Sequence, residues 1–287
     1  MSDQLNQFIA SHRQLFVLTG AGISTASGIP DYRDNSGEWK HQKPMDYRDF
    51  VASYAARQRY WSRSYFGWQR FSQASPNAAH SAIARLERLG RLAGTVTQNV
   101  DGLHQRAGSR QVVELHGSLA SVVCLGCGQS MARATLQQAL LDRNPQLSTA
   151  AGEMAPDGYA RLQNFDESKL DIPGCESCGG VVKPAVVFFG EAVPLKRVRH
   201  CRDLLAGCDA VLVVGSSLMV YSGYRFIREA VELGIPIAAI NRGKTRADDL
   251  LAHKFEVDCT TALAAALQHI ARARHIPSES ESESGAP

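Results

Sequence analysis

The sequence predicts an α/β protein: a Rossmann-like parallel sheet domain with a smaller, partly helical domain inserted into it. Short apolar runs alternate with segments of helical periodicity, as in a parallel sheet covered by helices on both faces. Two long segments interrupt this alternation. Residues 36–71 are aromatic and basic without strand character, and residues 122–180 contain four paired cysteines.

The expected strands are short runs rich in apolar and β-branched residues. They are residues 15–19, 92–97, 111–115, 181–189, 210–214 and 235–240. The expected helices carry apolar side chains at helical spacing and cover residues 76–89, 222–233 and 260–275. In the second helix we expect Ser222 to be the N-cap and Gly234 to be the C′ residue.

The two interruptions define the expected domains. Residues 1–35, 72–121 and 181–277 form the discontinuous Rossmann-like domain. Residues 36–71 and 122–180 form the smaller domain. Residues 278–287 are a Ser/Glu low-complexity tail that cannot bury a core, so we expect it to be disordered.

Composition excludes several classes of protein. The chain of 287 residues is 44% apolar and 21% charged, which argues against a disordered protein and against a coiled coil. The net charge is only +3, so no basic excess indicates nucleic acid as a partner. No apolar run is long enough to span a membrane, and the N-terminal segment lacks the features of a secretory signal. We therefore expect a cytoplasmic protein.

Glycines follow the first expected strand, in the motif Gly20-Ala21-Gly22-Ile23-Ser24. Such glycines let the backbone approach a phosphate, and the Ser24 hydroxyl adds a polar group. The motif departs from G-x-G-x-x-G, and taken alone it is as often a plain strand-to-helix turn. Tyr32 and Arg33 lie in the loop that follows, where Arg33 is a candidate phosphate or ribose contact. The alternative for that loop is an ordinary surface loop.

Polar groups also follow the second and third expected strands. Gln98, Asn99 and Asp101 surround Val100 and offer amide and carboxylate groups that suit a carboxamide ligand. Helix capping by Asn99 or Asp101 is the alternative. His116 follows the next strand and is a candidate general base, although a histidine considered alone is usually structural.

Two later strands end in small or polar residues at the same expected sheet edge. Gly215-Ser216-Ser217 follows one, and Asn241-Arg242-Gly243 follows the other. They suit ribose hydroxyls and an adenine, and each alone could equally be a helix-entry turn. Together with the Gly20 turn they indicate a dinucleotide along one edge.

Four cysteines form two C-x-x-C pairs, Cys124 with Cys127 and Cys175 with Cys178. Four thiolates are the closed tetrahedral ligand set of a structural zinc ion, so the smaller domain is expected to bind one zinc. The long separation means that the pairs need not form one compact knuckle. Two redox-active pairs are the alternative.

Taken in order, these motifs resemble the sirtuins, the NAD-dependent protein deacylases. The resemblance covers roughly residues 13–265. In addition to the motifs above it includes Gly28-Ile29-Pro30-Asp31-Tyr32-Arg33, and Lys183-Pro184 with Phe188-Phe189-Gly190-Glu191. Residues 220–227 and 245–250 resemble the class II branch, which includes a mitochondrial lipoamidase and ADP-ribosyltransferase-type member. Without a transit peptide, the chain is expected to be a bacterial relative.

The resemblance implies that NAD is consumed and that an acylated protein lysine is the substrate. In sirtuins the acyl oxygen attacks the nicotinamide ribose, nicotinamide leaves, and the acyl group is transferred to ADP-ribose. The resemblance makes His116 the base, with Asn99 and Asp101 at the nicotinamide end. At Val100 many members carry isoleucine, a departure of one methylene.

The resemblance also assigns the remaining contacts. The NAD set consists of Gly20, Ala21, Gly22, Ser24, Tyr32, Arg33, Gln98, Asn99, Val100, Asp101, Gly215, Ser216, Ser217, Asn241, Arg242, Gly243 and Cys259. The peptide substrate would pair as a strand with Val187, Phe188, Phe189 and Gly190.

Acyl specificity is a separate hypothesis. Tyr60 and Arg63 form a Tyr-x-x-Arg pair like the one with which desuccinylating sirtuins bind an acyl carboxylate, and the alternative is a solvated arginine on an amphipathic helix. The leading function is lysine deacylation. The alternatives are protein mono-ADP-ribosyl transfer and a catalytically silent NAD-binding module. The sequence leaves the oligomeric state open.

Overall fold

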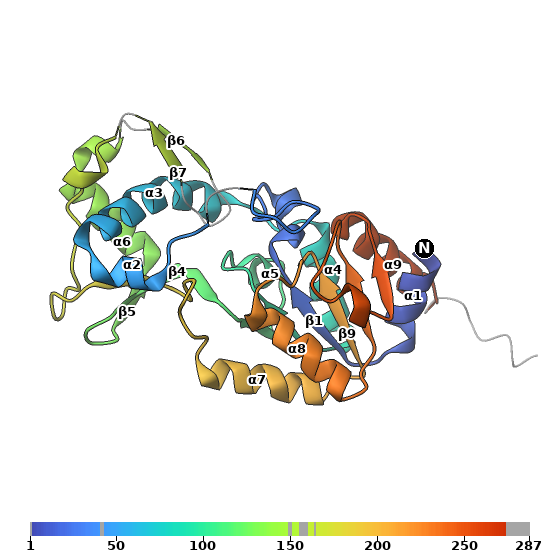
Figure 1. The fold of residues 1–287 in the computed structure, drawn as a ribbon. Coiled ribbons are helices and arrows are strands. Elements are labelled where there is room, and N and C mark those ends of the chain that lie inside the picture. The colour runs from blue at the N-terminus through green and yellow to red at the C-terminus, as the bar shows by residue number, and fades with distance from the viewer. Residues whose placement is uncertain (1, 41–42, 149–150, 155–159, 164, 274–287) are drawn as a thin grey trace, which may run out of the picture.

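The computed structural model describes residues 2–40, 43–148, 151–154, 160–163 and 165–273, and it contains two main sheets of different character (Figure 1). The helices are α1 (Ser2–Ser11), α2 (Tyr47–Ala52), α3 (Tyr54–Gln73), α4 (Ala78–Arg88), α5 (Leu103–Arg106), α6 (Arg133–Arg143), α7 (Leu195–Ala206), α8 (Tyr221–Glu232) and α9 (Cys259–Ala273). The strands are β1 (Leu15–Thr19), β2 (Leu92–Thr97), β3 (Val112–Glu114), β4 (Gly117–Cys124), β5 (Ser130–Ala132), β6 (Ala151–Met154), β7 (Ala160–Gln163), β8 (Val182–Val186), β9 (Ala210–Val214), β10 (Ile237–Ile240) and β11 (His253–Phe255). The predicted disordered tail, residues 278–287, lies outside the described residues.

The larger sheet has six strands in the order β11-β10-β9-β1-β2-β3, and all neighbouring pairs are parallel. This confirms the predicted Rossmann-like sheet. The strands at 15–19, 92–97 and 210–214 are reproduced to the residue. β10 begins two residues later than predicted, directly after Pro236, which has no N–H to contribute to a ladder.

Helices cover both faces of this sheet because its strands are apolar on both sides. Leu15 and Val17 of β1 pack with α1, α4 and α9, whereas Phe16 and Leu18 point the other way and pack with α7 and α8. The carboxyl ends of the strands are thereby left open at one edge.

The predicted helices are present, with one correction at a terminus. α4 begins after Asn77, whose side chain caps the helix, and α9 covers the described part of the predicted segment 260–275. Gly234 follows α8 with φ +70°, as predicted. Ser222 is not the N-cap of α8: the helix begins at Tyr221 with Val220 at the cap position.

The smaller part of the molecule is built around a three-stranded antiparallel sheet in the order β5-β4-β8. The strand predicted at 181–189 is β8. It is shorter than predicted and pairs with β4 of this sheet. Helices α2 and α3 supply aromatic side chains to the core of this part, among them Phe50, Tyr60 and Trp61, and α6 adds leucines. The aromatic composition of residues 36–71 therefore reflects two helices packed on the small sheet (Figure 1). Among the described helices, none combines the length and the apolarity that a membrane crossing requires.

Candidate active site

A cavity of about 930 Å³ lies at the carboxyl ends of the parallel strands, where the chain connects the two sheets. It brings most of the predicted site together. Its lining includes Ala21, Gly22, Ser24, Tyr32, Arg33, Tyr60, Gln98, Asn99, Val100, Asp101, His116, Val187, Phe188, Phe189, Gly190, Gly215, Ser216, Ser217, Asn241, Arg242 and Cys259. Of the predicted site residues outside the cysteine cluster, Gly20, Arg63 and Gly243 are described by the structure but do not line the cavity.

The glycine turn after β1 packs against the turn after β9 as closely as backbone allows. Gly22 N–H donates to Gly215 O at 2.8 Å. A Cβ at Gly22 would lie 2.9 Å from the same oxygen, and a Cβ at Gly20 would lie 2.7 Å from Cβ of Ser216. Side chains would push the two turns apart, so glycine keeps this wall of the cavity thin enough for a ligand phosphate to approach the backbone.

Ser24, Asn99 and Asp101 form one hydrogen-bonded group. Ser24 Oγ donates to Asp101 Oδ2 at 2.7 Å, and Asn99 Nδ2 donates to Ser24 Oγ at 3.0 Å and to Gly20 O at 3.1 Å. Asp101 Oδ1 also accepts from Leu103 N–H at 2.9 Å, so Asp101 supports the start of α5 as well. Fixed amide and carboxylate groups facing the cavity suit a carboxamide ligand.

Two buried histidines stand behind this group. His80 Nε2 lies 3.5 Å from Ser24 Oγ, and His104 Nε2 lies 2.9 Å from Thr19 Oγ1. Burial lowers the pKa of His80 to about 4, against the opposing effect of the Asp101 carboxylate. Burial, assisted by His80, lowers the pKa of His104 to about 3. Both imidazoles are therefore neutral at pH 7.

The loop after the glycine turn is held by an arginine stacked on a ring. The Arg33 guanidinium lies 4.1 Å from the centroid of Trp39, and its Nη1 donates to Gly37 O at 2.6 Å. Tyr32 packs edge-on to Trp39 at 6.1 Å between centroids. Arg33 and Tyr32 therefore face the cavity from an ordered loop.

The opposite end of the cavity follows β9 and β10. Ser216 Oγ donates to Gln98 Oε1 at 3.1 Å, which joins the ends of β9 and β2. Asn241 Nδ2 donates to Arg242 O at 3.0 Å, so this side chain shapes its own turn. The Cys259 thiol lies 3.6 Å from Ile240 O at the start of α9.

His116 lies between the two halves of the cavity. Its Nδ1 is 2.9 Å from Gln98 O, and its Nε2 is 2.7 Å from Ser222 Oγ. Burial lowers the pKa of His116 to about 4; the Gln98 carbonyl opposes this shift and the charge of Arg197 adds to it. A neutral imidazole at pH 7 is able to accept a proton, as a general base must.

The segment after β8 is fixed by a buried ion pair. Lys183 Nζ lies 3.0 Å from Glu191 Oε2, and the Lys183 side chain is only 5% exposed. Glu191 Oε2 also accepts from Phe188 N–H at 2.9 Å. Val187 N–H donates to His116 O at 2.7 Å, so this segment is tied to the backbone of the histidine.

Tyr60 and Arg63 lie on one face of α3 but have different surroundings. Tyr60 is buried and packs against Phe188, 5.2 Å between ring centroids, where it lines the cavity. Arg63 Nε instead forms an ion pair with Glu167 Oε1 at 2.7 Å.

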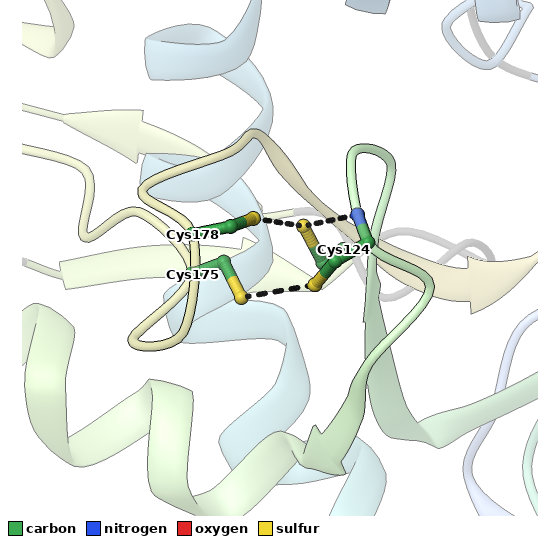
Figure 2. A group of neighbouring side chains, drawn as sticks. Cys124, Cys175 and Cys178 are labelled. Atoms are coloured by element: carbon green, nitrogen blue, oxygen red, sulfur yellow. Dashed lines mark hydrogen bonds between the residues drawn. The ribbon is translucent and has the colours of Figure 1, made fainter.

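The four paired cysteines meet in one cluster, in spite of the long chain between the pairs. Their sulfur atoms all lie within 4.8 Å of one another. Figure 2 shows Cys175 and Cys178 on one loop, with their side chains directed toward Cys124 on another. The distances are 3.5 Å from Cys124 to Cys178 and 3.7 Å from Cys127 to Cys175. Tetrahedral zinc with bonds of about 2.3 Å places its sulfur ligands about 3.8 Å apart. The cluster therefore fits a structural zinc ion.

Sequence reasoning missed several residues of the site. Ser222 was assigned a capping role, and the partner of Arg63 was not foreseen. Lys183 and Glu191 were noted as part of a motif without a role. The pairing of Lys183 with Glu191 could have been suspected, because a lysine inside an apolar strand requires an anionic or carbonyl partner.

Comparisons with known proteins agree with this geometry. A family model described as "Sir2 family" matches residues 20–222. The "NAD-dependent protein deacetylase 2" of Bradyrhizobium diazoefficiens is 53% identical over 263 residues, which span 92% of this chain and 96% of that protein. A solved structure described as "Sir2-p53 peptide-NAD+" has a TM-score of 0.77 at 29% identity and covers 95% of this chain and 99% of that chain. One described as "Sir2 bound to acetylated peptide" has a TM-score of 0.73 at 26% identity and covers 94% and 99%.

Proposed function

The chain belongs to the Sir2 family, the sirtuins, and from that premise we propose that it is an NAD-dependent protein deacetylase acting on acetyl-lysine side chains of other proteins. The observation that carries the proposal is that one cavity brings these groups together. It joins a glycine turn able to approach phosphate, a carboxamide-binding group, a neutral histidine and the segment 187–190.

When bound, NAD supplies the ADP-ribose that receives the acyl group as nicotinamide leaves. The chain's own residues bind and orient the two substrates, and they move a proton. Ser24, Asn99 and Asp101 hold the nicotinamide end in one orientation, because each is fixed by the others. His116 accepts a ribose hydroxyl proton at Nε2. The segment at Val187 orients the peptide beside that nitrogen, through its bond to the His116 carbonyl.

The test is a mass-spectrometric assay with NAD and lysine peptides, run for the parent and for His116→Ala. We expect acetyl loss that needs NAD and yields acetylated ADP-ribose, and we expect the variant to lose it. ADP-ribose retained on protein, without that product, would favour the alternative, mono-ADP-ribosyl transfer. NAD binding without turnover would favour a silent module.

Acyl preference is tested with the same peptides. The ion pair with Glu167 engages the Arg63 guanidinium, and this argues against binding of an acidic acyl group by Tyr60 and Arg63. We therefore expect acetyl-lysine to be preferred over succinyl-lysine, and Arg63→Ala to leave that ratio unchanged. If Arg63→Ala lost turnover of succinyl-lysine but kept turnover of acetyl-lysine, the acidic-acyl hypothesis would be restored.

Further proposals concern the organisation of the chain. We propose an NAD-binding domain of residues 1–35, 72–121 and 181–277 and a zinc domain of residues 36–71 and 122–180, with the correction that β8 and the first residues of β4 belong to the small sheet of the zinc domain. A cluster of reduced cysteines supports a reducing compartment, the cytoplasm of a bacterium. Membership of the class II branch remains a prediction.

A further inference from the structure

The hydroxyl of Ser222 lies against the nitrogen of His116 that faces the cavity. Ser222 is the second residue of α8, and its Oγ is 2.7 Å from His116 Nε2. Both residues line the cavity. The serine therefore touches the proposed base at the atom that has to receive a proton.

The other ring nitrogen fixes the direction of this hydrogen bond. Gln98 O is a carbonyl oxygen and can only accept, so His116 Nδ1, 2.9 Å away, must carry the ring hydrogen. A neutral imidazole with hydrogen on Nδ1 has a lone pair on Nε2. Ser222 Oγ–H therefore donates to Nε2.

We propose that Ser222 is a positioning residue for His116: its hydroxyl donates to Nε2 and holds that nitrogen as an acceptor facing the cavity before the co-substrate arrives. The role of His116 as base rests on the function proposed above. The serine contacts only the imidazole in this scheme, and neither the co-substrate nor the acyl-lysine, so it acts through His116.

Several charged groups also lie near His116, and the group hydrogen-bonded to its Nε2 is the neutral Ser222 hydroxyl. Arg197 of α7 lowers the pKa of His116 through its charge, and its Nη1 donates to Leu115 O at 3.0 Å. Arg225, one turn after Ser222, lines the same cavity, as does Asp101. Glu114 of β3 interacts with Arg197. All of these charges stay in place when only the serine hydroxyl is removed.

Removing the hydroxyl takes away the donor on Nε2. At pH 7 the imidazole is neutral, and its Nε2 lone pair then loses the hydrogen bond that Ser222 Oγ–H supplies. The ¹⁵N shift of Nε2 in the neutral ring should change accordingly.

The experiment is imidazole ¹⁵N NMR of the NAD-free protein at pH 7, with the His116 signals identified by their loss in His116→Gln. We expect the parent to show hydrogen on Nδ1, and Ser222→Ala to show an altered Nε2 shift. Ser222→Thr keeps a hydroxyl where Ser222→Val has a methyl group, so Thr should behave as the parent and Val as Ala. Ser81→Ala, on the exposed face of α4, is the control.

Identical Nε2 shifts in the Thr and Val proteins would overturn the inference. That outcome is separate from failure of the proposed function, because the spectra require no turnover. If the spectra show the hydrogen bond from Ser222 but the parent has no NAD-dependent deacetylation, only the proposed function is contradicted.

Discussion

Acidification should destabilise this protein more steeply than its carboxylates alone would, because three imidazoles are buried in neutral form. The pKa is lowered from 6.5 to about 4 for His80, about 3 for His104 and about 4 for His116. Between those values and 6.5 the unfolded chain binds more protons than the folded one. The stabilisation is therefore complete above pH 6.5 and is lost as the pH falls toward 4.

The magnitude follows from linkage. Each imidazole contributes up to about 1.4 kcal/mol per pH unit in this window, so a fall from pH 7 to about 5 removes about 2 kcal/mol per histidine. The three together give about 6 kcal/mol, which is comparable with the whole stability of many domains. Glu114 opposes part of this loss. Burial raises its pKa, so the folded state binds this proton more tightly than the unfolded chain and acidification adds to the free energy of unfolding.

The assay compares urea unfolding of the parent and His104→Gln at pH 7, 6 and 5. His104 is 1% exposed, so its contribution needs little correction for solvent. The variant should be less stable at pH 7, because it loses a buried contact with Thr19, but it should lose about 1.4 kcal/mol less per pH unit on acidification. His200→Gln on the exposed surface of α7 is the matched control. Parallel stability–pH curves for parent and His104→Gln would refute the reasoning.

Three further outcomes are expected. Cys175→Ser should lose bound zinc, measured by elemental analysis, and unfold at lower temperature, since metal binding contributes folding free energy; full zinc content would contradict the cluster. Lys183→Met should raise the peptide KM several-fold and cost about 2–4 kcal/mol in urea unfolding, because Glu191 loses its buried partner; an unchanged KM would show that the pair does not shape the peptide segment. Gly22→Ala should weaken NAD binding about tenfold by calorimetry, about 1.4 kcal/mol, because its Cβ would lie 2.9 Å from Gly215 O; undiminished affinity would mean that the turns can separate freely.

Local signals predicted the parallel sheet well. The strands at 15–19 and 210–214 are wholly buried runs, so their apolar composition alone defines their ends. The cysteine cluster was predictable for a different reason: thiolate chemistry needs four ligands together, whatever the length of chain between them.

Contacts between distant segments were not predictable from one sequence. A serine before an apolar helical pattern is typical of an N-cap, and the competing partner of Ser222 lies 106 residues away at His116. Arg63 has the helical spacing of a ligand-binding arginine, but its actual partner, Glu167, is 104 residues away. In both cases tertiary packing determined which of two chemically reasonable roles the side chain has.

The position of His116 at the junction of the two sheets has a mechanical consequence. Its backbone belongs to the smaller sheet, since β4 starts at Gly117 and the His116 carbonyl accepts from Val187. Its ring is hydrogen-bonded to Gln98, which follows β2 of the larger sheet, and to Ser222 of α8. Gly117 has φ +81°, and a Cβ there would lie 2.0 Å from Ala185 O, so the crossing point has no room for a side chain. The orientation of the imidazole therefore depends on how the two sheets meet: a rotation of one sheet against the other would have to break the hydrogen bonds of the ring to Gln98 and Ser222 or the backbone bond to Val187.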